Sequence, residues 1–263
     1  MAVRLGVIGG GNMGAALVGG LLGAGWQPAH LAVIEVLAAR REQLAAMFPG
    51  VELRPSLDGL SLESAVIAVK PHDAAAATAA AVHAGAQRVL SIAAGVMLET
   101  LEAAAGGAAV VRAMPNTPSL VGEGAAAIAA GRRATDGDLD WAEEILGSVG
   151  TVVRVGEQHL DAVTGLAGSG PAYLFLVAEA LTDAGVVAGL PRATCEALVA
   201  QLLVGSAALL RDRGDPAALR AMVTSPGGTT AAGLRVLEEQ AVRSAFIEAV
   251  AAATRRSIEL GRS

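Results

Sequence analysis

Short apolar runs alternate with longer stretches of helical periodicity over the first part of the chain. Runs of strand length stand at residues 3–8, 31–35, 65–69, 88–92, 110–113 and 152–155. Helical stretches separate them, at residues 12–22, 40–47, from 73 onward, 98–105 and, as a charged surface helix, 136–146. Such alternation predicts a parallel sheet with crossover helices, and therefore an α/β domain.

The second part of the chain loses the strand pattern near residue 159 and keeps only helical periodicity. Helices are expected at residues 171–187, 192–212, 216–222, 231–240 and 242–260. The glycine-rich segment 165–171 indicates that one helix stops and another starts. We therefore expect two domains, residues 1–157 with the sheet and residues 158–263 all-α.

Composition narrows the class of protein without giving a function. Hydrophobic residues make up 53% of the chain and aromatic residues 2%, so the core must consist of small aliphatic side chains. The net charge is -6, with acids and arginines interspersed, which argues against a nucleic-acid partner. Residues 5–34 carry no charge and look like a signal sequence or membrane span by that measure. Their many glycines favour a buried strand, loop and helix instead, with no membrane partner.

Cysteine and histidine usage argues against disulfide and metal chemistry. The one cysteine, Cys195, stands in an apolar helical pattern and cannot form a disulfide within one chain, which fits a reducing, cytoplasmic setting. A lone buried thiol is typical of a small hydrophobic residue. The four histidines share no metal-ligand spacing, so we expect no metal site.

A glycine motif joins the first expected strand to the first expected helix. Gly9, Gly11 and Gly14 form G-x-G-x-x-G between residues 3–8 and the helix, the context that makes this motif informative. Gly9 permits the tight turn, Gly11 lets a pyrophosphate approach, and Gly14 allows close packing of helix on strand. Free N–H groups at Asn12 and Met13 then bind phosphate. The alternative is a glycine-rich turn with no ligand.

Lys70 is the only lysine of the chain and follows a predicted strand directly. Ligands of parallel sheets bind beyond the carboxyl ends of the strands, so Val69, Lys70 and Pro71 are expected at the edge that carries the glycine loop. Pro71 biases Lys70 toward an extended backbone. An ammonium on a flexible stem beside a bound dinucleotide explains the lysine; compositional accident is the alternative.

The residues at the end of the second predicted strand do not decide between NADH and NADPH. Glu35 stands where an acidic residue commonly accepts hydrogen bonds from the adenosine ribose, which favours NADH. Arg40 and Arg41 follow and could hold a 2'-phosphate, which favours NADPH. A solvated Glu with two solvated Arg is the third alternative.

One loop of the helical part has the composition of a binding site. Residues 224–230, Thr-Ser-Pro-Gly-Gly-Thr-Thr, precede a predicted helix. Their hydroxyls and the N–H groups of the helix start can converge on a carboxylate. The alternative is an ordinary N-cap, which needs only one Ser or Thr.

Taken together, the motifs resemble those of pyrroline-5-carboxylate reductases. The matching stretches are VIGGGNMG, AVKP, SIAAGV, RAMPNTP, GLAGSGPAY and PAALRAMVTSPGGTTAAGLRVLE, and the resemblance runs from about residue 3 to residue 259. The last of these is the most specific. The resemblance implies reduction of 1-pyrroline-5-carboxylate to L-proline with NADPH or NADH, the last step of proline biosynthesis. It also implies a Rossmann-type domain, an all-α dimerisation domain and dimers that often form decamers.

The resemblance also assigns residues to the two ligands. Ser225, Gly228 and Thr229 would hold the substrate carboxylate, in a pocket that uses this loop from the partner subunit. Thr230 would hydrogen-bond the ring nitrogen and is the candidate catalytic residue. The nicotinamide half of the cofactor would be lined by Lys70, Pro71, Ala93, Ala94 and Asn116. Glu35 departs from the small polar residue common in relatives, which puts the usual NADPH preference in doubt.

Two competing functions fit the sequence less well. A hydroxyacid dehydrogenase of the same layout would need a lysine in the helical domain, and none follows Lys70; a protonated imine is already electrophilic and needs no strong acid. A nucleotide sensor without activity would have no reason to keep the polar loop at 224–230.

Overall fold

The computed structural model describes residues 3–261, and the chain forms two compact units. Unit 1 consists of Met1–Ser169 with Ala252–Ser263, and unit 2 of Gly170–Ala251. The sheet lies in unit 1, and unit 2 is helical. The two units thus have the α/β and all-α characters expected from the sequence, whereas the boundary at residue 157 stays a prediction.

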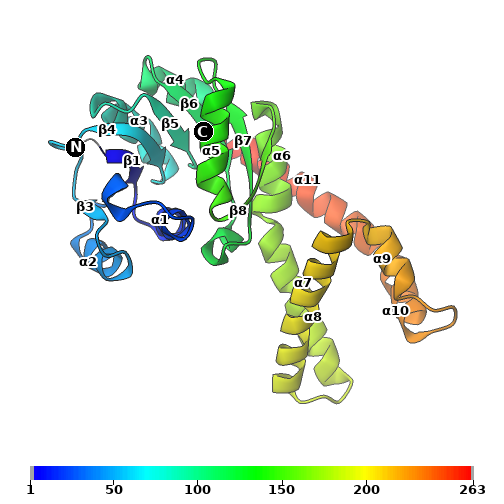
Figure 1. The fold of residues 1–263 in the computed structure, drawn as a ribbon. Coiled ribbons are helices and arrows are strands. Elements are labelled where there is room, and N and C mark those ends of the chain that lie inside the picture. Colours follow the sequence, from blue (N-terminus) through cyan, green and yellow to red (C-terminus); the bar gives the residue numbers. More distant parts are fainter. Residues whose placement is uncertain (1–2, 262–263) are drawn as a thin grey trace. The chain divides into compact units, whose positions relative to one another are not determined.

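Unit 1 is built on one eight-stranded sheet of order β3-β2-β1-β4-β5-β6-β7-β8 (Figure 1). The strands are β1 (Val3–Ile8), β2 (Leu31–Ile34), β3 (Glu52–Arg54), β4 (Leu62–Ile67), β5 (Arg88–Ser91), β6 (Ala109–Met114), β7 (Gly124–Ala130) and β8 (Gly150–Arg154). The strand order changes direction at β1, which pairs with both β2 and β4 in parallel. Crevices for ligands form at such a switch point.

Helices cover both faces of this sheet because strand side chains alternate between the faces. The core of one face combines the strands with α1 (Asn12–Gly23), α2 (Ala38–Met47) and α5 (Asp136–Gly147). That of the other face combines them with α3 (Ala74–His83), α4 (Leu98–Ala105) and α6 (Leu160–Val163). Neighbouring β1 residues divide accordingly: Val7 belongs to the first core and Ile8 to the second. The expected α/β domain is confirmed, with helices on both faces of its sheet.

Two strands and one strand direction were not expected. Neither β3 nor β7 has a clear strand pattern in the sequence; β7 is Gly-Ala-Ala-Ala-Ile-Ala-Ala. Alanine is depleted in strands, but β7 lies between β6 and β8 and most of its residues are buried. It pairs antiparallel with β6, so the expectation of a purely parallel sheet is wrong for this pair. The short connection from β6 to β7 permits only that direction.

The expected helix stop at residues 165–171 is also wrong. A π-helical turn, Thr164–Gly168, continues α6, and α7 (Gly170–Val187) follows it. The N–H of Ser169 donates to the carbonyl of Thr164 over 2.8 Å, the i to i+5 bond of a π turn. Each glycine costs about 1 kcal/mol in a helix interior, yet here the segment shifts to π-type hydrogen bonds instead of losing them.

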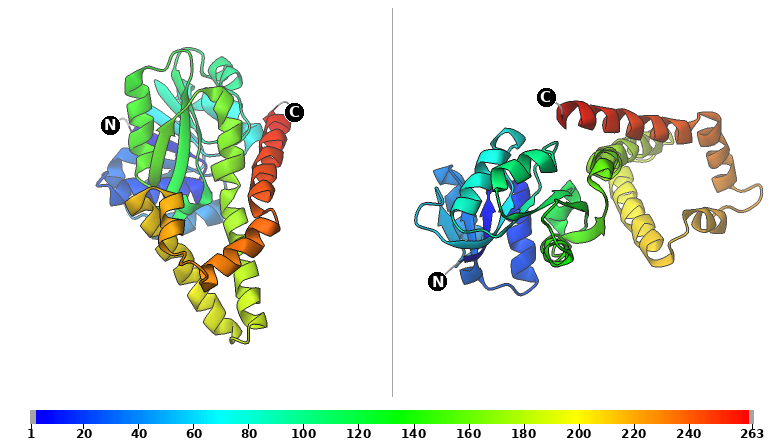
Figure 2. Two further views of the ribbon diagram at one scale, coloured as in Figure 1. Left: turned by 90° about the vertical axis from the view of Figure 1, so that its right-hand side faces the viewer. Right: turned by 90° about the horizontal axis from the view of Figure 1, so that it is seen from above.

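Unit 2 consists of helices alone, with α7 and α8 side by side (Figure 2). After α7 come α8 (Arg192–Arg213), α9 (Pro216–Met222), α10 (Thr229–Glu239) and the first part of α11 (Val242–Gly261). Cys195 is buried and free on α8, where its Sγ faces Gly185 of α7. Helices Glu157–Val187 and Arg192–Arg213 are long and apolar enough to cross a membrane by length and composition.

Candidate functional site

The loop from β1 to α1 lies at the switch point and is held there by its neighbours. Gly9 adopts φ +105, and a Cβ on it would stand 2.5 Å from the carbonyl oxygen of Ala68, beyond β4. Its N–H donates to the carbonyl of Ile34 on β2 over 2.8 Å. Only glycine fits this left-handed conformation and this close approach. The tight turn assigned to Gly9 is thus what the structure contains.

The first turn of α1 leaves its N–H groups for a ligand. Gly11 is the N-cap, and no side chain of the described residues caps this helix. A Cβ on Gly11 would meet nothing within 4 Å, so the space in front of the turn is open. A Cβ on Gly14 would instead overlap the carbonyl oxygen of Gly9, which shows how closely the helix packs on the turn. An uncapped helix start beside open space fits a dinucleotide pyrophosphate.

A cleft of about 610 Å³ runs along the carboxyl ends of the central strands of unit 1. It brings together predicted residues from four segments of the chain. Its lining is Ile8, Gly9, Gly11, Asn12, Met13, Ile34, Glu35, Val36, Leu37, Ala68, Val69, Lys70, Ile92, Ala94, Met114 and Pro115. Of the residues expected to bind the cofactor, Gly14, Pro71, Ala93 and Asn116 are outside this lining.

The carboxylate of Glu35 accepts hydrogen bonds from two main-chain N–H groups. Its Oε2 accepts the N–H of Gly10 over 3.0 Å, and its Oε1 accepts the N–H of Leu37 over 2.9 Å. One bond reaches the glycine loop and the other the segment after β2. Glu35 therefore fixes the end of β2 to the glycine loop, and the alternative of a freely solvated Glu is wrong.

Both arginines that follow Glu35 also bind the main chain. Arg40 donates from Nε to the carbonyl of Gly10 over 2.7 Å. Arg41 donates to the carbonyls of Glu35 and Val36 over 2.7 and 2.9 Å. Gly10 thus holds Glu35 with its N–H and Arg40 with its carbonyl. Sequence reasoning did not single out Gly10, although a glycine between the two motif glycines was a signal.

Lys70 lies after the end of β4, exposed at the rim of the cleft. Its backbone is extended, with φ -64 and ψ 150, as the following proline predicts. Pro71 opens a short 3-10 turn, Pro71–Asp73, that leads into α3. The Lys70 ammonium makes no ion pair with the described residues, so it is available to a ligand.

The remaining predicted cofactor residues have structural contacts. Ala93 is buried, and its N–H donates to the Ser91 hydroxyl over 3.4 Å. The side-chain amide of Asn116 donates to the carbonyl of Ala167 over 3.0 Å and accepts the N–H of Ala125 over 2.8 Å. Asn116 therefore joins the loop after β6 to β7 and to the π turn. Its assignment to the nicotinamide remains a prediction.

An ion pair that the sequence did not lead us to expect connects β6 to the turn before α6. Arg112 on β6 is buried, and its guanidinium lies 2.8 Å from the carboxylate of Glu157 and 3.1 Å from the sulfur of Met97. The same carboxylate accepts the N–H of Leu98 at the start of α4. An arginine inside an apolar strand was the available signal. The pair fixes the loop from β5 to α4, which contains Ala94.

The hydroxyl loop between α9 and α10 belongs to unit 2. The N–H of Gly228 donates to the carbonyl of Ser225 over 3.0 Å and closes a turn with Pro226 and Gly227 at its centre. Gly227 has φ +69, the left-handed conformation that a Pro-Gly turn of type II requires. This turn places Ser225 beside the start of α10.

The start of α10 is uncapped among the described residues. Gly228 is the N-cap, and no side chain accepts from the first-turn N–H groups, so the alternative of an ordinary Ser or Thr cap is wrong. The Thr224 hydroxyl donates to the carbonyl of Arg220 in α9. Those of Ser225, Thr229 and Thr230 have no such partner within residues 3–261. Hydroxyl and N–H donors without charge fit a carboxylate.

The described residues contain no cluster of three or more His, Cys, Asp or Glu side chains that could hold a metal ion. Unit 1 thus contains an uncapped helix start, an anchored carboxylate and a rim ammonium. Unit 2, taken by itself, contains a group of neutral donors. Each group can bind an anion.

Two family descriptions match the chain. Residues 157–260 match the family described as pyrroline-5-carboxylate reductase dimerisation, and residues 4–95 match NADP oxidoreductase coenzyme F420-dependent. The first match covers the helices from α6 to α11. The second covers the glycine loop and most of the segments that line the cleft.

Relatives cover the whole chain. A pyrroline-5-carboxylate reductase of Synechocystis sp. is 44% identical over 100% of both chains. That of Mycobacterium tuberculosis is 42% identical and covers 98% of this chain and 96% of its own. Among solved structures, a pyrroline-5-carboxylate reductase from Coxiella burnetii has a TM-score of 0.92 and 34% identity over 99% of each chain. The Plasmodium falciparum pyrroline carboxylate reductase with NADP bound has a TM-score of 0.83, 30% identity and 98% coverage of both.

Proposed function

The chain belongs to the pyrroline-5-carboxylate reductase family and reduces 1-pyrroline-5-carboxylate to L-proline with NAD(P)H, and we propose where it binds each reactant. In this proposal the cleft holds the cofactor and the hydroxyl loop holds the imine. The observation that carries the residue assignment is the uncapped start of α10 behind Gly228, with free hydroxyls beside it. The corresponding feature on the cofactor side is the uncapped start of α1 behind Gly11. Each is a site for an anion, and the two reactants each carry one or more anionic groups.

The glycine loop and the strand ends bind the cofactor. The N–H groups of Asn12 and Met13 receive the pyrophosphate, with Gly9 and Gly14 shaping the turn. Lys70 adds positive charge at the rim of the cleft, and Val69, Pro71, Ala93, Ala94 and Asn116 position the nicotinamide half. Bound there, the reduced cofactor supplies the hydride that becomes the new C–H bond of proline, as the imine C=N bond becomes single.

The hydroxyl loop binds and orients the imine. Ser225, Gly228 and Thr229 donate to the substrate carboxylate, and Thr230 hydrogen-bonds the ring nitrogen. The protonated imine carries its positive charge on that nitrogen and loses it when the carbon is reduced. The protein therefore has to orient the ring rather than supply a strong acid. A neutral hydroxyl at Thr230 suits this role because it neither competes for the proton nor adds charge.

The chain self-associates through the part that matches the dimerisation family. The helices of unit 2 carry many exposed apolar side chains in one copy, among them Leu174, Phe175, Leu176, Leu198, Leu202 and Val204. Apolar surface of this extent indicates a partner. We propose that a second copy covers it rather than lipid, and that dimers assemble further into decamers in a cytoplasmic enzyme. Light scattering in the absence of detergent tests this, because a membrane-inserted chain would precipitate or require detergent.

One experiment tests whether the loop of one copy serves the cleft of another. Thr230→Ala weakens only the loop, and Gly14→Ala only the cleft. When the two variants are co-expressed, some dimers contain one chain of each kind. If a cleft uses the loop of the other copy, such a dimer has one complete site, formed by the intact cleft of the Thr230→Ala chain and the intact loop of the Gly14→Ala chain. Activity well above that of either variant supports this arrangement. Activity no higher than the two separate variants shows that each chain uses its own loop.

The reaction itself is tested by its product. We expect one molecule of L-proline for each molecule of cofactor oxidised, measured by chiral amino-acid analysis. Cofactor binding without proline formation would favour the sensor alternative.

A further inference from the structure

Glu35 is anchored more firmly than a carboxylate that merely follows a strand. Its two oxygens each accept one main-chain N–H, from Gly10 and from Leu37. Gly10 belongs to the glycine loop between β1 and α1. Glu35 and Leu37 belong to the segment between β2 and α2. Because the two bonds come from different segments, together they hold the carboxylate at the end of β2.

The anchored carboxylate still has acceptor capacity toward the cleft. A carboxylate oxygen offers two lone pairs, and the structure uses one on each oxygen of Glu35. Glu35 is half-buried and lines the cleft together with Val36 and Leu37. No ion pair neutralises it among residues 3–261. The remaining lone pairs can accept a further hydrogen-bond donor, and a ribose hydroxyl is one.

A 2'-phosphate has the wrong chemistry for this position. Near neutral pH it carries about -1.5 to -2 charges and offers only acceptor oxygens once fully ionised. Beside Glu35 it would place acceptor against acceptor and like charge against like charge. A free 2'-hydroxyl instead donates to the carboxylate.

The two arginines nearby are already bonded to the main chain. Arg40 uses its Nε on the carbonyl of Gly10 and one further nitrogen on the side chain of Gln43. Arg41 holds two main-chain carbonyls with one nitrogen. These bonds support the glycine loop and the end of β2. Each guanidinium also has a nitrogen without such a bond among the described residues, so variants of both arginines belong to the test.

From these contacts we propose that Glu35 makes this enzyme select NADH over NADPH at the adenosine ribose. The proposal rests on the proposed place of the cofactor in the cleft. It concerns selectivity only: the glycine loop and Lys70 bind features that both cofactors share.

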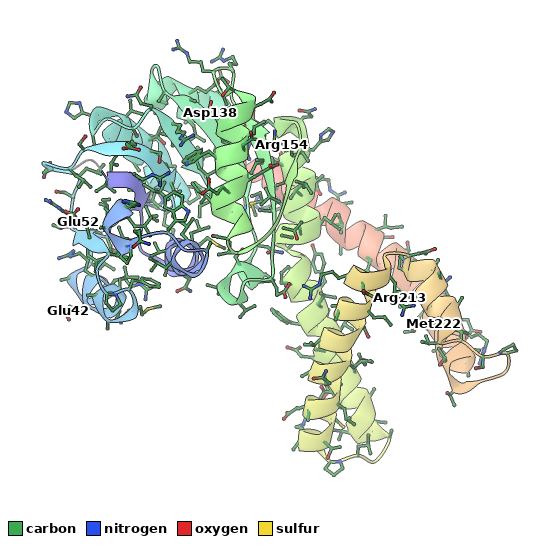
Figure 3. All side chains as sticks on the ribbon, in the orientation of Figure 1. Glu42, Glu52, Asp138, Arg154, Arg213 and Met222 are labelled. Carbon is green, nitrogen blue, oxygen red and sulfur yellow. The ribbon has the colours of Figure 1, made fainter. Side chains whose placement is uncertain are left out.

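The test compares wild type with Glu35→Gln and with Glu42→Gln. Glutamine keeps the shape and one acceptor oxygen but removes the charge. Glu42, labelled on α2 in Figure 3, is exposed, so its variant has the same change in net charge away from the cleft. Dissociation constants for NADH and NADPH are measured by nucleotide fluorescence titration, and kcat/KM with pyrroline-5-carboxylate for both cofactors.

We expect wild type and Glu42→Gln to bind NADH roughly tenfold or more tightly than NADPH, and Glu35→Gln to reduce this ratio by roughly tenfold. The change should come mainly from tighter NADPH binding. Wild type that binds NADPH at least as well as NADH would overturn the proposal, as would an unchanged ratio in Glu35→Gln. Binding ratios decide it even without turnover, whereas turnover with neither cofactor would count against the proposed function instead.

A second pair of variants tests whether Arg40 or Arg41 binds a 2'-phosphate. Arg40→Ala and Arg41→Ala should each weaken NADH and NADPH by similar factors, because Arg40 supports the glycine loop and Arg41 the end of β2. Selective loss of NADPH in either variant would show that an arginine holds a 2'-phosphate and would contradict the proposal.

Discussion

Arg112 and Glu157, 45 residues apart in the chain, lie 2.8 Å from each other in unit 1. The side chain of Arg112 is 5% exposed and that of Glu157 25%. Glu157 also accepts the N–H of Leu98, so a single carboxylate joins β6, the start of α4 and the turn before α6. The pair sits inside unit 1 and supports the loop that carries Ala94.

Loss of this pair should destabilise unit 1. Arg112→Met leaves a mostly buried carboxylate without its cation, and we expect the free energy of unfolding to fall by about 2–3 kcal/mol. Arg256→Met is the matched control, because Arg256 and Glu259, also in unit 1, form a pair whose side chains are 66% and 63% exposed; there we expect a loss below about 1 kcal/mol. Denaturant unfolding at fixed protein concentration, followed by the fluorescence of Trp26 and Trp141, measures both. Equal losses would contradict the account.

Gly14→Ala should abolish tight cofactor binding. The new methyl group would overlap the carbonyl oxygen of Gly9, which is backbone and cannot move without displacing the turn. We expect the dissociation constants of both NADH and NADPH to rise by roughly tenfold or more. Gly23→Ala, in the same helix, meets nothing within 4 Å and should leave both unchanged. Tight binding by Gly14→Ala would show that the turn tolerates a side chain.

Lys70→Arg tests why this chain has a lysine at the rim of the cleft. The ammonium is compact and its stem flexible, whereas a planar guanidinium is bulkier and more rigid. We expect cofactor affinity to fall several-fold with little change in melting temperature, because Lys70 is exposed. Michaelis constants for NADH and NADPH measure the effect. If both are unchanged, compositional accident explains the lysine.

Thr230→Ala tests the assigned catalytic residue. Removing the hydroxyl should lower kcat with the imine by roughly tenfold to a hundredfold, since orientation of the ring nitrogen is lost. Nucleotide titration should show unchanged cofactor binding, and Thr230→Ser should recover most of the turnover. The control is Thr224→Ala, because the Thr224 hydroxyl already donates to the main-chain carbonyl of Arg220. Full activity in Thr230→Ala would remove Thr230 from the mechanism.

The sequence allowed prediction of the features that depend on local chemistry. Gly9, Gly11 and Gly14 have spacing that only a tight turn before a helix explains, and the structure has that turn. Pro71 likewise fixed the extended backbone of Lys70. The Pro-Gly pair in the hydroxyl loop is similar, because the turn type follows from the two residues themselves.

Features that depend on distant partners could not be predicted. Strand β7 is alanine-rich and becomes a strand only because β6 and β8 flank it. The π turn at Thr164–Gly168 looked like a helix stop, since glycine spacing alone does not show a shifted hydrogen bond. The bonds of Glu35 to Gly10 and of Asn116 to Ala167 connect residues far apart in sequence. No local pattern encodes them.

The most direct test of the central claim is the loss of reduced-cofactor absorbance on adding pyrroline-5-carboxylate, with NADH and NADPH side by side. The account predicts turnover that requires the imine, with NADH the better cofactor at equal concentrations below saturation. A protein that binds the cofactor yet oxidises neither NADH nor NADPH in the presence of the imine would contradict it.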